Sequence, residues 1–121
     1  MRTVPDLLAE IRGLIAVHAR PDLQTPVAGL RLSRVETSEE HHSLTEPLLV
    51  VMAQGGKRLM LGEQVVEYRA GECLVLTAEL HVTGHFIDAS PQVPALALGL
   101  ALIATSAAAL VLGSEALRLL L

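Results

Sequence analysis

Four histidines and one glutamate are the residues in this sequence whose types best suit metal chemistry. They are His41, His42, His81, His85 and Glu46. All lie in a region of short strands, and imidazole or carboxylate groups that line a barrel can bind a divalent metal. However, adjacent residues on a strand point to opposite faces, so only one of His41 and His42 could face inward, and the proline after Glu46 indicates a bend. The spacing therefore favours ordinary polar histidines at strand ends and turns.

The motifs of several common enzyme classes are absent from the sequence. It holds no nucleophile elbow, phosphate loop, zinc-binding CxxC pair or Gly-rich dinucleotide turn. The run Gly55-Gly56-Lys57-Arg58 is typical of a hairpin tip with solvated charges. Cys73 begins an apolar run, where a thiol usually behaves as a small buried hydrophobe, so we do not expect it to be catalytic.

Length and composition limit the classes of function. The chain has 121 residues, enough for one domain with a modest core. Its 9 basic and 13 acidic residues give a net charge of −4, which disfavours a stand-alone nucleic-acid binder. With one Tyr, one Phe and no Trp, the core must be aliphatic and offers no stacking platform. A single cysteine permits no intrachain disulfide, which predicts a cytoplasmic location.

The elements that must position these residues are a helix followed by strands. Apolar residues at helical spacing predict an amphipathic helix within residues 1–20, which lacks the features of a secretory signal. Alternating runs then predict strands at 30–36, 48–54, 58–61, 64–68, 73–77, 85–88 and 95–102. Glycines at 55–56, 62 and 71 are expected to form hairpin turns between them. Such close spacing predicts an antiparallel sandwich or barrel over residues 27–102.

Residues 89–114 contain no charge and are long enough to cross a bilayer. Pro91 and Pro94 interrupt this stretch, and small and large residues alternate after them as in a buried strand. The pattern therefore predicts a strand followed by a helix at 105–121, not a membrane span. That apolar helix would either pack on the barrel or form a dimer interface.

Several strings, in order, resemble one known family. They are residues 40–47 (EHHSLTEP), 51–58 (VMAQGGKR), 61–62 (LG), Tyr68, 70–71 (AG), 82–84 (VTG) and 89–91 (ASP). Together they resemble the N-terminal domain of AraC-type transcriptional regulators, over roughly residues 7–102. The resemblance implies a mainly β, cupin-like antiparallel barrel, a double-stranded β-helix or jelly roll, with a helix at each end.

The resemblance also implies a function. Residues 1–121 would form a single domain that senses a small-molecule effector and forms a homodimer, without enzymatic activity, cofactor, metal or membrane contact. DNA would be bound only through a C-terminal helix-turn-helix module that is absent from this chain. A natural terminus usually ends in polar residues, so the apolar end at 119–121 favours an excised piece over a natural product, and we leave both open. The expected ligand-binding residues are His42, Glu46, Val51, Tyr68, Leu76 and His81.

Departures from the family pattern leave alternatives open. His81 stands where the family usually has proline, and Ala70 replaces the usual proline before glycine. One alternative is a metal-dependent cupin enzyme that uses His42, Glu46 and His81, with His85 as a further ligand. Its histidine spacing departs from that of metal-binding cupins, which favours a lost metal site. Another alternative is a module that only dimerises.

Overall fold

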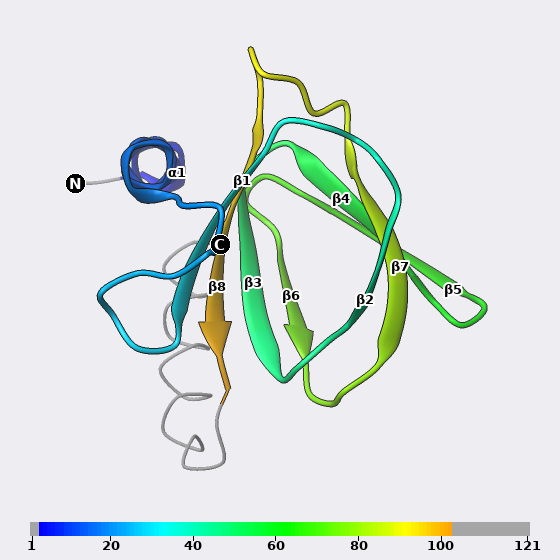
Figure 1. Cartoon of the computed structure of the whole chain (residues 1–121). Coiled ribbons are helices and arrows are strands. Elements are labelled where there is room, and N and C mark those ends of the chain that lie inside the picture. The colour runs from blue at the N-terminus through cyan, green and yellow to red at the C-terminus, as the bar shows by residue number, and fades with distance from the viewer. Residues whose placement is uncertain (1–2, 103–121) are drawn as a thin grey trace.

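The chain folds into one N-terminal helix and eight strands within residues 3–102, the part that this computed structural model describes (Figure 1). The elements are α1 (Val4–His18), β1 (Leu30–Val35), β2 (His41–Leu44), β3 (Leu48–Gln54), β4 (Gly56–Leu61), β5 (Gln64–Arg69), β6 (Cys73–Leu76), β7 (His81–Ile87) and β8 (Ala95–Ala101). The helix expected at 105–121 lies outside the described residues.

The strands form two antiparallel sheets that face each other (Figure 1). Their strand orders are β1-β8-β3-β6 and β2-β7-β4-β5. Only β4 and β5 are both consecutive in the sequence and paired in one sheet, so elsewhere the chain crosses from one sheet to the other at each connection. Eight strands in two sheets with this order make a double-sheet jelly roll, the architecture to which cupins belong. The expected fold class, mainly β and cupin-like, is confirmed.

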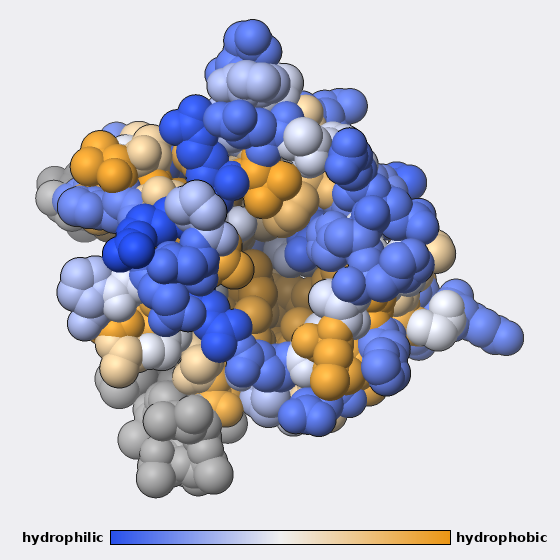
Figure 2. All heavy atoms as spheres, viewed as in Figure 1, coloured by the Kyte–Doolittle hydropathy of each residue, from blue (hydrophilic) through white to orange (hydrophobic). Residues whose placement is uncertain are grey.

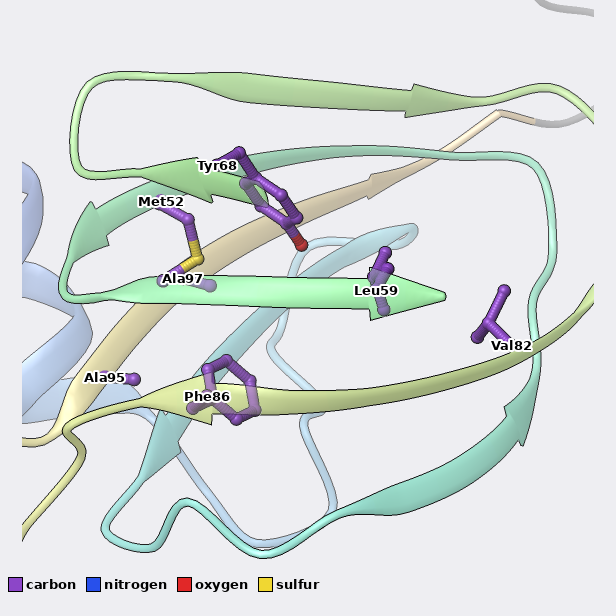
Figure 3. Close-up of a cluster of buried hydrophobic side chains, with 7 residues drawn as sticks. All are labelled: Met52, Leu59, Tyr68, Val82, Phe86, Ala95 and Ala97. Carbon is purple, nitrogen blue, oxygen red and sulfur yellow. The ribbon is translucent and has the colours of Figure 1, made fainter. Parts of the chain in front are cut away.

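The main core lies between the sheets. Its buried members are Met52, Leu59, Tyr68, Val82, Phe86, Ala95 and Ala97 (Figure 3). They come from β3 and β8 of one sheet and from β4, β5 and β7 of the other. Alternate residues of a strand face opposite ways, so each strand contributes every second side chain to this layer.

A second cluster joins α1 to the outer face of the first sheet. Ile15 is fully buried in it, beside Leu32 of β1 and Leu96 of β8. A capping box between Thr3 and Asp6 satisfies the first turn of the helix. As the sequence predicts, the leucines of β8 share one face. Leu96 and Leu98 pack in the cluster with α1. The small residues of β8 consequently face the interior.

Two strands differ from those expected from the sequence by more than two residues. β2 was not expected as a separate strand, and β7 begins at His81, four residues before the expected start. Residues 41–44 need little apolar alternation because β2 is an edge strand of its sheet and is mostly exposed. The hairpin glycines are confirmed, since Gly55, Gly62 and Gly71 have φ values of 83°, 62° and 88°. Within residues 3–102, no helix is long and apolar enough to cross a membrane.

Gly84 of β7 allows a close approach that no other residue would allow. A Cβ at this position would lie 2.6 Å from Leu59 Cδ2 and 3.0 Å from the Arg58 carbonyl oxygen. Leu59 is 3% exposed and has little room to move. We therefore expect Gly84→Ala to destabilise the fold by about 1–3 kcal/mol, measured by urea unfolding.

Gly13→Ala is the matched control. Nothing lies within 4 Å of a Cβ at Gly13, which is in the interior of α1. Because alanine favours a helix over glycine by about 1 kcal/mol, this variant should be neutral or more stable. Equal effects of the two substitutions would contradict the close packing at Gly84.

Candidate functional site

A cavity lies between the two sheets and opens to one side of the jelly roll. Its inner part measures about 160 Å³ and its mouth about 440 Å³. The two parts are continuous, because they share six lining residues, Leu23, Arg31, Leu48, Val50, Lys57 and Tyr68. Figure 2 shows a hollow with hydrophobic walls and a mainly hydrophilic rim. The dimensions suit a small organic molecule.

Small side chains create this space. Ala97 and Gly99 of β8 line the inner part of the cavity, where larger side chains would fill it. The alternation of small and large residues that predicts a strand at 95–102 thus also determines where the hollow lies.

Lys57 is the charged group of greatest interest in the cavity. On β4 it pairs with Tyr68 of β5 and with Phe86 of β7, and all three side chains line the inner part of the cavity. Its ammonium lies over the Phe86 ring, 4.7 Å from the centroid. Among residues 3–102, this ammonium forms no ion pair or hydrogen bond. Burial lowers the pKa of Lys57, because the cation loses its hydration.

Tyr68 places a hydroxyl next to Lys57. The residue is 4% exposed, and its oxygen points toward the space between the sheets (Figure 3). Within the described part of the chain, this hydroxyl has no hydrogen-bond partner. Burial raises the pKa of Tyr68 to about 12, so the phenol stays protonated and can donate a hydrogen bond to a ligand.

The mouth of the cavity carries both signs of charge. Arg31 of β1 forms an ion pair there with Glu46, and Glu79 also lines the mouth. Thr45 holds the two loops of the rim together, because its Oγ1 donates to the Ala78 carbonyl oxygen at 3.1 Å and accepts from a backbone N–H at 3.0 Å. Arg31 therefore already has a carboxylate partner.

The structure places the ligand-binding residues expected from the sequence in three different surroundings. Glu46, Tyr68 and Leu76 all line the mouth of the cavity. Val51 is buried but points away from the interior, since its neighbours on β3, Val50 and Met52, line the cavity. His42 and His81 lie on the outer face of the second sheet, in a shallow groove that also includes Met60.

The histidines do not converge on a metal site. His42 points outward and its Nδ1 lies 2.9 Å from Thr83 Oγ1. His41 points inward and stacks on Phe86 at 6.1 Å between centroids. Burial, and then the charge of Lys57, lower the pKa of His41. Within residues 3–102, no three His, Cys, Asp or Glu side chains are placed to hold a metal ion. The metal-binding set of His42, Glu46 and His81, with or without His85, is therefore not assembled.

The sequence predicted that residues 55–58 form a hairpin tip with two solvated charges, and this prediction was wrong for Lys57. Gly55 forms the turn, and Arg58 is exposed and paired with Glu67 at 2.8 Å, as a hairpin tip predicts. Lys57 instead points into the interior. Its position two residues before the buried Leu59 could have indicated this, because residues i and i+2 of a strand share a face.

The fold and the hollow between its sheets define a cupin-like jelly-roll domain with an internal pocket. Residues 26–118 match the family described as the AraC-type transcriptional regulator N-terminus. This match spans most of the chain, and the chain belongs to that family. The family expected from the sequence strings is therefore confirmed. No curated protein matches the sequence.

Several solved structures are distantly similar. A cupin-2 domain-containing protein from Shewanella frigidimarina shares 12% identity at a TM-score of 0.49, over 74% of this chain and 90% of that chain. An HTH_3 family transcriptional regulator from Vibrio cholerae shares 15% identity at a TM-score of 0.43, over 78% and 61%. Apo-HppE shares 13% identity at a TM-score of 0.45, over 60% of this chain, and the match spans only 40% of its length. Likenesses this remote do not by themselves assign a function.

Tyr68 can be titrated without interference, because the chain contains one tyrosine and no tryptophan. We expect its ultraviolet absorbance to titrate near pH 12 in the folded protein and near about 10 in urea. Because the folded pKa is the higher one, the neutral phenol contributes stability that is fully present below the unfolded pKa. That contribution is lost as pH rises through the folded pKa. A folded-state midpoint equal to that in urea would contradict the burial of this phenol.

Proposed function

We propose that this domain senses a small-molecule effector that binds in the cavity between the sheets. The observation that carries the proposal is the continuous internal cavity, in which Lys57 and Tyr68 present polar groups without protein partners among residues 3–102. A cavity with apolar walls and a few convergent polar groups is typical of a ligand site. Membership in a family of regulator N-termini supports sensing over catalysis.

A ligand in this cavity would contact both sheets at once. Arg31 and Val50 belong to the first sheet, and Lys57 and Tyr68 belong to the second. The first sheet also carries α1 on its outer face. A ligand that binds one spacing of the sheets better than another would shift the population toward that arrangement. We propose that this shift changes how a C-terminal helix-turn-helix module, outside this chain, is presented to DNA.

The remaining parts of the proposal follow from the family. A regulator of this type would act in the cytoplasm as a homodimer, because helix-turn-helix regulators commonly read two half-sites with two copies. We propose that the domain is not an enzyme. In support, the candidate ligands His42 and His81 lie on the outer face, away from the cavity.

Filling the cavity tests the proposal. Ala97→Leu adds three carbons to the inner wall, so it should abolish binding of any effector found by calorimetric screening. Overpacking should cost about 1–3 kcal/mol of stability, which thermal unfolding will report. Gly99→Ala is the gentler variant, since its Cβ would lie 3.4 Å from Leu48 Cδ1, an ordinary contact, and it should weaken binding without unfolding the domain.

Ala16→Leu is the matched control for Ala97→Leu. Ala16 lies on the exposed face of α1, so the same chemical change should leave effector affinity unaltered. An effector that binds the wild type, Ala97→Leu and Ala16→Leu equally well would place its site elsewhere and reject the proposed one.

A further inference from the structure

The cavity has an unbalanced charge in its inner part. Its lining there includes two basic side chains, Arg31 and Lys57, and no acidic one. Arg31 is neutralised by Glu46 at the mouth. Lys57 has only the face of the Phe86 ring, which attracts a cation much more weakly than a carboxylate does. A cation removed from water without an anion is destabilising for the protein.

We propose that the effector is an organic acid with a single carboxylate, which binds the ammonium of Lys57 while its apolar part lies against the cavity wall. This inference rests on the proposed function, since it names the chemical class that the same cavity selects. An ion pair that is also a hydrogen bond is the strongest non-covalent contact that such a group can make.

A second donor lies beside the ammonium. Lys57 and Tyr68 are directly opposite each other on β4 and β5, and both side chains line the inner cavity. The Tyr68 phenol remains protonated, because burial raises its pKa to about 12. A carboxylate has two oxygens, so one can accept from Lys57 Nζ and the other from the Tyr68 hydroxyl.

The charge and shape of the cavity favour a monoanion over a phosphate. One unpaired ammonium balances one negative charge, and a dianion would leave a second charge buried among Val50, Met52 and Phe86. Phosphate sites usually add several backbone N–H donors from a loop or helix end, whereas the backbone groups here are engaged in strand pairing. The inner volume of about 160 Å³ suits a compact apolar body.

The position of Lys57 is fixed before any ligand binds. A Cβ at Gly84 would lie 3.6 Å from Lys57 Cε, so the lysine stem lies across the glycine of β7. The cation–π contact with Phe86 holds the other end of the side chain. Such preorganisation lowers the entropy lost when a ligand is bound.

Matched acids and amides test the proposal in the 121-residue chain. The probes are benzoate with benzamide, and hexanoate with hexanamide, each pair differing in charge but hardly in shape. We expect calorimetry to show the acid of at least one pair binding about tenfold to a hundredfold more tightly than its amide. Lys57→Met keeps the apolar stem and should abolish that preference. Arg58→Met, next along β4 but outward-facing, should keep it.

A measurement without ligand tests Lys57 independently. If its ammonium is buried without an anion, Lys57→Met should raise the melting temperature of the free protein by a few degrees, because an uncompensated charge is removed. Arg58→Met should not raise it, since Arg58 is exposed and paired with Glu67. A lysine that served only to support the fold would give the opposite result when replaced.

The outcomes separate this inference from the proposed function. Amides that bind as tightly as their acids, in a manner blocked by Ala97→Leu, would overturn the acid preference and leave the cavity as the effector site. Phenyl phosphate that binds more tightly than benzoate would overturn the choice of a monoanion. Failure of every acid to bind at millimolar concentration, or acid binding that survives in Lys57→Met, would also overturn the inference.

Discussion

The structure depends on one constraint, that consecutive side chains of a strand point to opposite faces of a sheet. On β8 this constraint sends Ala97 and Gly99 toward the interior and Leu96 toward α1. The helix is held because leucines face it, and the interior is hollow because small residues face it. A one-residue shift in the register of β8 would turn its leucines into the cavity and would also remove the leucines that pack against α1. Helix packing and binding space are therefore set by the same seven residues, Ala95–Ala101.

The same constraint gives two adjacent basic residues opposite surroundings. Arg58 lies outside, where its side chain and that of Arg69 donate hydrogen bonds that lower the pKa of Glu67. Lys57 lies inside, where loss of hydration lowers its own pKa. An exposed ion pair contributes little to stability, and a buried cation without an anion reduces it. Arg58 is therefore a residue that the fold can replace at small cost, whereas the partly buried charge of Lys57 opposes the stability that its packed stem contributes.

Much of the fold could be predicted from sequence, because it rests on local patterns. β3 was predicted at its observed bounds. Its residues before Gln54 are all apolar, and a glycine turn follows. β2 was missed because an exposed edge strand needs no apolar alternation. The pocket was harder to predict from alternation and family resemblance: of the expected residues, Tyr68 lines the cavity, whereas His42 and His81 lie on the outer face. Lys57 was missed because residues 55–58 were interpreted as a turn. The buried Leu59, two residues further along β4, could have shown that Lys57 faces the interior.

The two aromatic residues of the chain lie on either side of Lys57, which relates them to the cavity as well as to the core. The whole chain has one tyrosine and one phenylalanine, and both are the direct cross-strand neighbours of Lys57. If bulk packing were their purpose, aliphatic side chains would fill this space as they fill the rest of the core. Rings have few rotatable bonds, so Tyr68 and Phe86 keep the walls beside the ammonium in one shape. The Phe86 face stabilises the cation by about 0.5–2 kcal/mol, and the loss of hydration that lowers the pKa of Lys57 opposes this gain. The anion that we propose would offset this loss of hydration by pairing with Lys57 Nζ.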